Sequence, residues 1–315
     1  MPHPQHKNTA LTSMILAEWQ RDVPDAVSMA ARTIADMYGD TVSAVIFYGS
    51  CLRTGEIEDK ILDFYVIVDS YLDAYDKRWL AVGNKILPPN VFYHEMDVDG
   101  MTIRSKYAVL SSKDFSYRVS QGCLNVSVWA RFCQPCMVLN ARSEAIENYL
   151  ARDVATAVVT MLNAVKMLLP NNVDSKSIWV SAFEHTYAAE LRSEPTGKGL
   201  EIYELDKERY DKLSPAIFPI LGVDTRSKNL DHRPYAWPRH KSNFKWFARR
   251  WNGKVVSFLR LIKASITFDG GIDYLAWKIS RHSGVQVEVK DWMRKHPILA
   301  GISLFFSMRK KGAFK

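Results

Sequence analysis

The segment that most constrains the fold is residues 42–70, in which two apolar strands are joined by a short polar loop. The first strand, residues 42–48, is rich in β-branched and aromatic side chains, which is typical of a buried strand. It runs directly into Gly49 and Ser50, and near the start of the second strand Asp63 stands among apolar neighbours. Because an unpaired buried carboxylate is costly, we expect Asp63 to have a partner, such as a metal ion or hydrogen-bond donors.

These features together predict a site for phosphate and magnesium. Gly49 allows the backbone to approach another group closely, and the N–H groups of such a turn can bind phosphate oxygens. Ser50 adds a hydroxyl, and Asp63 can hold a hard cation such as Mg²⁺. An ordinary α/β hairpin with a capped aspartate is the alternative interpretation of the same residues.

The order of a Gly-Ser turn followed by a strand that carries Asp resembles the nucleotidyltransferase superfamily, which includes polymerase-β-like enzymes. In that superfamily a second Asp or Glu stands two residues after the first. Here that position is Tyr65, so the sequence departs from the superfamily pattern.

Charge is unevenly distributed along the chain. The 315 residues are 47% hydrophobic and 24% charged, which is ordinary for a globular protein of two modest domains. Residues 239–315 contain 17 Lys or Arg against four Asp or Glu, a net of +13, so the overall +8 leaves −5 for residues 1–238. A basic tail indicates nucleic acid, an anionic membrane surface or an anionic substrate as the partner.

Cysteine usage and hydropathy restrict the class further. Cys133 and Cys136 have the spacing of half a zinc or redox site, but the sequence has no second such pair. We therefore interpret the four cysteines as reduced, structural thiols of a cytosolic protein. The first 14 residues show the pattern of neither a secretory signal nor a transit peptide. No apolar run reaches the ~18 residues that a spanning helix needs.

Periodicity and turn residues predict the remaining elements. Helices are expected over residues 9–38, 71–86, 143–169, 177–192 and 201–215, with an irregular connector over 216–240.

Residues 91–110 are expected to form a hairpin, with Asp97 and Asp99 as turn formers. His94 is interpreted as a partly buried structural histidine. Lys106 lies inside an apolar strand, so we expect it to have a phosphate or carboxylate partner.

Several further motifs, in the same order along the chain, resemble the mitochondrial-type CDP-diacylglycerol synthases, the translocator assembly and maintenance protein family. That family also lacks the second carboxylate at the position of Tyr65. Two departures are Ala108 in place of a glycine and His94 in place of an asparagine. The resemblance covers roughly residues 45–275. Its motifs are Tyr48-Gly49-Ser50, Leu62-Asp63-Phe64, Lys106-Tyr107-Ala108-Val109-Leu110-Ser111, Arg131-Phe132-Cys133-Gln134-Pro135, Thr186-Tyr187-Ala188-Ala189-Glu190-Leu191-Arg192 and residues 266–271.

The resemblance implies an α+β protein in three consecutive parts. A nucleotidyltransferase-like mixed sheet with flanking helices is expected over residues 1–142. A mainly helical, winged-helix-like domain and its connector follow over residues 143–238. The basic segment 239–315 then binds a membrane surface or the substrate.

The implied activity is that of a phosphatidate cytidylyltransferase, which converts CTP and phosphatidate to CDP-diacylglycerol and pyrophosphate with Mg²⁺ as cofactor. Asp63 and Lys106 are the candidate catalytic residues, and Asp63 is the candidate metal ligand. The candidate nucleotide-binding residues are Tyr48, Gly49, Ser50, Tyr107 and Arg131, and the candidate ligands of substrate phosphate are Arg192 and Lys263.

A soluble enzyme must come to its lipid substrate, so we expect peripheral binding to the inner face of the membrane, with no stable nucleic-acid partner. Because no transit peptide is visible, we expect a bacterial protein. The apolar residues expected to insert are Ile298, Leu299, Phe305 and Phe306, and those expected at the headgroups are Arg309, Lys310 and Lys311. A last helix docked on the core is the alternative for this segment.

Two rival functions fit the same sequence, and the oligomeric state is left open. The first is a nucleotidyltransferase that acts on a soluble small molecule or on tRNA. The second is a catalytically inactive relative that binds nucleic acid through the basic tail 239–315, which begins with aromatic residues among its charges.

Overall fold

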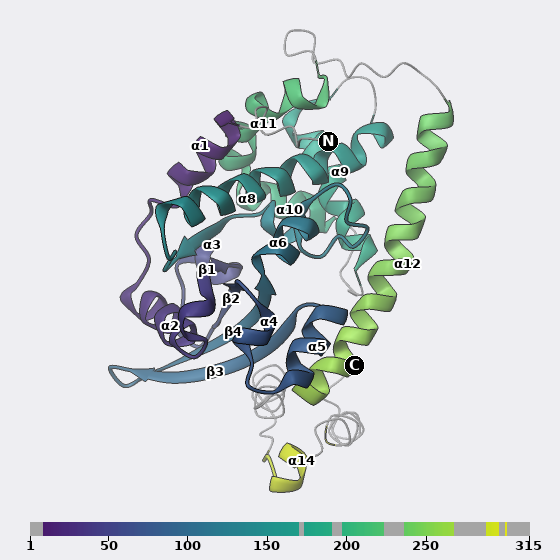
Figure 1. Ribbon diagram of the computed structural model, residues 1–315. Coiled ribbons are helices and arrows are strands. Elements are labelled where there is room, and N and C mark those ends of the chain that lie inside the picture. Colours follow the sequence, from purple (N-terminus) through teal and green to yellow (C-terminus); the bar gives the residue numbers. More distant parts are fainter. Residues whose placement is uncertain are drawn as a thin grey trace. The chain divides into compact units, whose positions relative to one another are not determined.

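The computed structural model describes residues 9–169, 173–190, 197–223, 236–267, 288–295 and 300, and it confirms the predicted α+β class (Figure 1). The chain divides into two compact units, each assembled from separate pieces of sequence. We call residues 23–111 and 259–315 the sheet unit, and residues 1–22 and 112–258 the helical unit.

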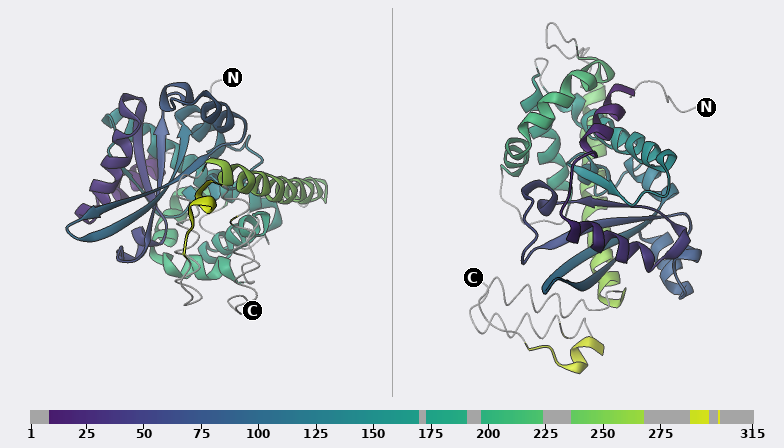
Figure 2. Two further views of the ribbon diagram at one scale, coloured as in Figure 1. Left: turned by 90° about the horizontal axis from the view of Figure 1, so that it is seen from below. Right: turned by 90° about the vertical axis from the view of Figure 1, so that its left-hand side faces the viewer.

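A five-stranded mixed sheet has the strand order β3-β4-β2-β1-β5. β1 and β2 are antiparallel, β3 and β4 form an antiparallel hairpin, and β2 and β4 are parallel. The tip of the hairpin extends past the other strands (Figure 1 and Figure 2). The predicted strands and the hairpin are therefore confirmed. The strands are β1 (Val42–Tyr48), β2 (Ile61–Val68), β3 (Asn90–Val98), β4 (Met101–Ser111) and β5 (Cys136–Leu139).

The turn of the hairpin is built by the residues that the sequence indicated. Asp97 accepts a hydrogen bond from the backbone N–H of Gly100 at 3.0 Å. Asp99 has a positive φ of 52°, which Asp tolerates better than most residues. Both aspartates therefore form the turn, as predicted.

One face of the sheet packs against α2 (Asp25–Asp36), which contacts strands β1 to β4. The helix buries Val27, Ala30 and Ile34, whose spacing places them on one helical face. Pro24 precedes α2, so the helix predicted over residues 9–38 is in fact two helices separated at residues 19–24. The other short elements of the sheet unit are η1 (Gly39–Thr41), α3 (Ser50–Thr54), α4 (Tyr71–Ala74), α5 (Arg78–Ile86) and α14 (Asp291–Lys295).

The helical unit is organised around α8 (Glu144–Val165), which contacts α1, α6, α7, α9 and α11. Its middle section is buried on nearly all sides, so this helix has little polar face. Among the described residues, no helix is both long enough and apolar enough to cross a membrane. The other helices are α1 (Thr9–Glu18), α6 (Ser112–Val119), α7 (Trp129–Phe132), η2 (Lys166–Leu168), α9 (Ser175–Ala189), α10 (Lys198–Leu205), α11 (Lys207–Leu221) and α12 (Ala236–Thr267), of which α12 continues past residue 258 into the sheet unit.

The predicted connector over residues 216–240 is wrong at both ends. α11 continues through Pro215 and Pro219 to Leu221, and α12 begins at Ala236. Ile217 and Leu221 are fully buried, so the burial of apolar side chains offsets the missing backbone hydrogen bonds of the prolines.

All four cysteines are buried free thiols, which confirms the structural interpretation. The Cys133 thiol donates to the carbonyl oxygens of Trp129 at 2.9 Å and Ala157 at 3.2 Å. Burial raises the pKa of Cys136 to about 12, so its thiolate is scarcely populated at neutral pH.

Candidate functional site

The candidate site begins where β1 ends. Gly49 has a φ of 96°, a conformation that residues with a side chain rarely adopt. A Cβ atom at this position would lie 3.0 Å from Oδ2 of Asp63. Both the backbone conformation and the close approach to the carboxylate therefore require glycine here.

Asp63 lies between two other residues of the predicted site. It is the cross-strand partner of Tyr48 on β1 and of Lys106 on β4. Because directly paired residues point to the same face of a sheet, the three side chains share one face. Nζ of Lys106 lies 3.3 Å from Oδ1 of Asp63, so the carboxylate partner predicted for Lys106 is confirmed.

The pair between Asp63 and Lys106 remains open to solvent. The Asp63 side chain is 25% exposed and the Lys106 side chain is 38% exposed. An ion pair at this exposure contributes only about 0–1 kcal/mol to stability, so a charged ligand could replace one partner at small cost. The arrangement is chemically suited to binding a polyanion next to a cation.

Two residues that the sequence analysis did not name lie on the same face. Tyr93 of β3 is paired with Lys106, and its hydroxyl hydrogen-bonds the Glu95 carboxylate. Arg104 lies two residues before Lys106 and forms ion pairs with Glu95 at 3.3 Å and Asp59 at 3.5 Å. Arg104 could have been predicted from the sequence, because the alternation of strand residues places residues 104 and 106 on one face.

Tyr107 does not join this face. Lys106, the preceding residue of β4, points to the face that carries Asp63. Because adjacent strand residues alternate, Tyr107 points to the other face of the sheet, against which α2 packs. The Tyr107 ring stacks on Phe92 with centroids 5.5 Å apart, and its hydroxyl accepts a hydrogen bond from Tyr38 at 3.5 Å. Burial raises the pKa of Tyr38 above its ordinary value, so the Tyr38 hydroxyl stays neutral.

The remaining residues of the predicted Gly-Ser site, Tyr48 and Ser50, flank Gly49 in the chain. Ser50 begins α3 and is exposed. The ring of Tyr48 lies against that of Tyr65, with centroids 5.4 Å apart. Tyr65 is 1% exposed, so an aromatic ring occupies the position at which the superfamily has a second carboxylate.

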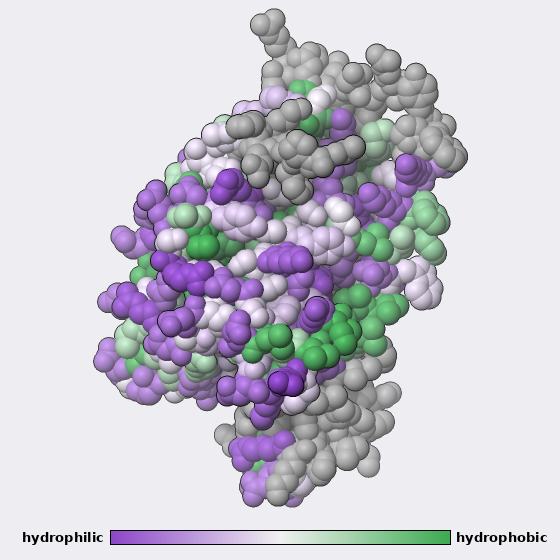
Figure 3. All heavy atoms as spheres, in the orientation of Figure 1, coloured by the Kyte–Doolittle hydropathy of each residue, from purple (hydrophilic) through white to green (hydrophobic). Residues whose placement is uncertain are grey.

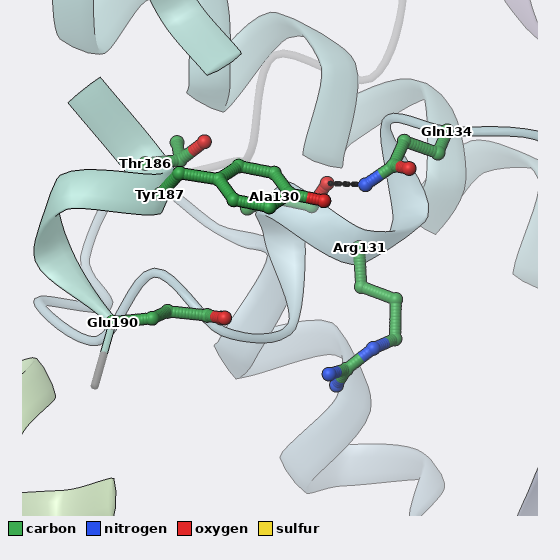
Figure 4. A pocket seen from close by; sticks show the side chains of 6 residues that line it. All are labelled: Ala130, Arg131, Gln134, Thr186, Tyr187 and Glu190. Atoms are coloured by element: carbon green, nitrogen blue, oxygen red, sulfur yellow. Dashed lines mark hydrogen bonds between the residues drawn. The ribbon is translucent and has the colours of Figure 1, made fainter. Parts of the chain in front are cut away.

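Arg131 lies in the helical unit, where it lines a pocket (Figure 4). Gln134 lines the same pocket and donates to the carbonyl of Ala130 at 3.4 Å. The opposite wall is α9, from which Tyr187 extends across the pocket and Glu190 points into it. Two motifs that lie more than 50 residues apart in the sequence, 131–135 and 186–190, therefore meet at one pocket.

The structure places Lys263 at a turn of the backbone. Its ammonium donates to the carbonyl of Leu87 and, at 2.8 Å, to that of Pro89. A role of Lys263 with substrate phosphate stays a prediction. The other predicted residues lie outside the described part of the chain, namely Arg192, Ile298, Leu299, Phe305, Phe306, Arg309, Lys310 and Lys311.

Asp63 suits a metal site in which a bound substrate supplies most of the ligands. Within the described ranges, no three His, Cys, Asp or Glu side chains come together as a protein-only metal site. Mg²⁺ is commonly held by one or two carboxylates together with the phosphate oxygens of a substrate. Asp63 suits this second kind of site, in which the nucleotide supplies the other ligands.

Comparison with known proteins gives no family assignment. No family model matches this chain, and no curated protein matches its sequence. Evidence on the function comes from the geometry of Gly49, Asp63 and Lys106, which we call the Asp63 cluster.

Proposed function

We propose that the protein is a phosphatidate cytidylyltransferase that works at a membrane surface. A phosphate oxygen of phosphatidate attacks the α-phosphorus of CTP, the bond from that phosphorus to the bridging oxygen breaks, and pyrophosphate leaves. The single observation that carries the proposal is the Asp63 cluster. In it, a glycine turn touches a carboxylate, and that carboxylate is paired with a lysine.

Each member of the cluster has a role that suits its chemistry. The backbone at Gly49 can approach the triphosphate closely because no side chain intervenes. Asp63 would hold Mg²⁺ together with phosphate oxygens, and the cation would neutralise the charge of the triphosphate. Lys106 would then exchange its contact with Asp63 for a phosphate oxygen. Phosphoryl and nucleotidyl transfers depend mainly on such positioning and charge neutralisation.

The residues around Asp63 favour a phosphate acceptor over an alcohol acceptor. An alcohol needs a base to remove its proton, whereas a phosphate monoester is largely ionised at pH 7 because its second pKa is near ~6. Tyr65 supplies no carboxylate, and the Glu95 carboxylate on the face of Lys106 is already paired with Arg104. His94 points to the opposite face of β3 from Tyr93. His94 of β3 therefore does not lie beside Lys106.

The pocket at Arg131 gives additional support. The sequence resemblance includes both the 131–135 and the 186–190 motifs, and these motifs share the pocket in Figure 4. A meeting of two motifs in space is expected when both serve one ligand, but the cavity of about 30 Å³ has room for about one water molecule and not for a phosphate group, so the support comes only from the meeting of the motifs.

The exposed face of α12 supports attachment to a membrane. Apolar side chains lie along this helix (Figure 3) at spacings of three or four residues. Lysines lie on both sides of this stripe, at Lys241 and Lys254. This pattern is typical of helices that lie in the headgroup region, so binding should need anionic lipid and weaken with salt. The exposed apolar residues are Phe244, Phe247, Trp251, Val255 and Leu259.

The test is transfer of labelled CTP to a chloroform-soluble product in vesicles that contain phosphatidate. Asp63→Asn should abolish transfer, because the variant loses the charge that holds the metal and pairs with Lys106. Asp73→Asn is the matched control, since Asp73 is an exposed residue of α4. Full activity of Asp63→Asn would remove Asp63 from the mechanism.

A pyrophosphate assay separates the proposal from its rivals. Release of pyrophosphate from CTP should require phosphatidate. Release that requires tRNA or a soluble acceptor would assign a different transferase, and nucleic-acid binding without any pyrophosphate release would assign an inactive relative.

A further inference from the structure

The helical unit contains a buried arginine without an anionic partner. Arg249 of α12 is 4% exposed, and its Nε atom is buried with no hydrogen-bond partner. Within the part of the chain that the structure describes, no carboxylate forms an ion pair with it. Burial lowers the pKa of Arg249, as expected for a cation removed from water.

Aromatic rings hold the guanidinium of Arg249 in place. Its Cζ atom lies 5.0 Å from the centre of the Trp246 ring and 5.8 Å from that of Trp129. Such contacts stabilise a cation partly, but they leave its buried Nε–H donor without an acceptor. The side chain is therefore fixed in position while this donor is unused.

Arg249 lines a pocket between α8 and the first half of α12. The pocket has a volume of about 200 Å³ and is open to solvent at its mouth. Thr160 contributes a second buried polar atom without a partner, its Oγ1, and is 2% exposed. The other polar side chains at the pocket include Gln121, Asn163, Lys241 and Lys245, and none of the described residues that line it is a carboxylate.

Three cations of the pocket lie on one face of α12. Lys241, Lys245 and Arg249 follow one another at intervals of four residues, which places them on successive turns. Like charges at this spacing repel each other and destabilise a helix. A dianion in the pocket would remove that repulsion and give Arg249 the partner it lacks.

Two hydrogen bonds hold the walls of the pocket in place. Nε1 of Trp246 donates to the carbonyl of Ala164 at 2.8 Å, which fixes α12 against the end of α8. The amide of Asn125 donates to Asn252 at 3.1 Å. The pocket therefore exists before any ligand enters, so little ordering is required on binding.

We infer that this pocket binds a phosphate group, either as free phosphate or as a small phosphate monoester. The guanidinium of Arg249 has the planar fork of donors that matches phosphate oxygens. Thr160 and Asn163 can donate from α8, and Lys245 supplies a second charge at the mouth. None of these residues belongs to the Asp63 cluster, so the inference goes beyond the proposed function.

The experiment measures the melting temperature of the full chain with inorganic phosphate or glycerol 3-phosphate, against chloride at equal ionic strength. Both ligands are titrated to give apparent dissociation constants. Phosphate should raise the melting temperature above that in chloride. A stronger effect of glycerol 3-phosphate would identify a monoester as the ligand, and equal effects would identify free phosphate.

Matched lysine variants locate the binding. Lys245→Gln should weaken phosphate binding about tenfold, whereas Lys254→Gln should leave it unchanged. Both lysines are exposed on α12 and both changes remove one charge, but only Lys245 lines the pocket. Arg249→Gln should weaken binding further, and Lys106→Gln should not affect it. If Arg249→Gln does not fold, Lys245→Gln decides the question because its side chain is exposed.

Three results would overturn the inference. Phosphate that stabilises no more than chloride would show that the pocket does not select the anion. Equal losses in Lys245→Gln and Lys254→Gln would show a general effect of charge. Loss of binding in Lys106→Gln would place the bound phosphate at the Asp63 cluster.

Discussion

The two units each contain an ion pair that joins distant parts of the chain, and the pairs differ in burial. In the helical unit, Nε of Arg209 lies 2.8 Å from Oε2 of Glu18, and the side chains are 7% and 16% exposed. In the sheet unit, Lys106 lies 3.3 Å from Asp63, and both side chains are more exposed. Arg209 also donates to the carbonyl of Cys133 at 2.9 Å.

The difference indicates what each pair does. Glu18 of α1 and Arg209 of α11 are both largely buried. Separating them would leave a buried charge without its partner. Asp63 and Lys106 face water, so a ligand can displace one from the other. We therefore expect the first pair to be needed for stability and the second to be needed for activity.

The largest effect on stability is expected from the buried pair. Arg209→Ala should lower the free energy of unfolding by about 3–5 kcal/mol, because Glu18 is left as a buried charge without a partner. Urea denaturation measures this loss. Lys207→Ala is the control on the same helix, since its pair with Asp211 is exposed, and it should leave the midpoint nearly unchanged. A small loss for Arg209→Ala would contradict the structural role of the pair.

Asp153 of α8 differs from Glu18 because no buried cation among the described residues is paired with it, so its ionisation should lower the stability of the fold. Burial raises the pKa of Asp153 to about 6, although its carboxylate accepts a hydrogen bond from Ser116 at 2.6 Å. Because this pKa is higher than in the unfolded chain, Asp153 contributes stability below about pH 4. That contribution is lost as the pH rises through 6.

Comparison with Asp153→Asn isolates this effect. Relative to the variant, the wild-type protein should lose at most about 3 kcal/mol of unfolding free energy between pH 4 and pH 7. Urea denaturation at several pH values measures the difference. Parallel pH profiles for the two proteins would mean that the pKa of Asp153 is not raised.

Glycine substitutions separate backbone strain from the chemistry of the Asp63 cluster. Gly49→Ala and Gly55→Ala both place a side chain at positive φ, 96° and 72°, and each should lose about 1–2 kcal/mol of stability. At Gly55 the new Cβ meets no atom within 4 Å, whereas at Gly49 it meets the Asp63 carboxylate. Only Gly49→Ala should therefore lose cytidylyl transfer. Equal activity of the two variants would argue against a site at Gly49.

The smallest change in stability is expected at Lys106. Lys106→Gln should alter the free energy of unfolding by less than about 1 kcal/mol, since the pair is exposed. Transfer from CTP should nevertheless fall about 100-fold, because a group that stabilises the phosphate charge is lost. Parallel denaturation and activity measurements check both. A stability loss as large as that of Arg209→Ala would remove the contrast between the two pairs.

Local sequence determined much of the sheet and its turns. The β-branched runs predicted β1 and β2, and Asp97 and Asp99 predicted the hairpin turn. The expectation that Lys106 has an acidic partner was also correct, because a cation in an apolar strand needs one. These features depend on residues close in sequence or on the cost of burying a single charge.

The alternation of residues along a strand predicts which face each side chain occupies, and the assignment of Tyr107 to the site ignores this alternation. The prediction places Tyr107 at the nucleotide and its neighbour Lys106 at the catalytic centre of the same site, but adjacent strand residues point to opposite faces. The same alternation would have indicated Arg104, which lies on the face of Lys106.

Only the tertiary structure decided which distant segments belong together. The sequence suggested three consecutive parts with boundaries at residues 142 and 238, whereas the compact units combine residues 1–22 with 112–258 and residues 23–111 with 259–315. Glu18 and Arg209 are 191 positions apart, and the sequence does not indicate that they pair. Likewise, nothing local distinguishes Arg249 from the other cations of α12. Its burial depends on Trp129 and Trp246, which packing alone brings to the same guanidinium.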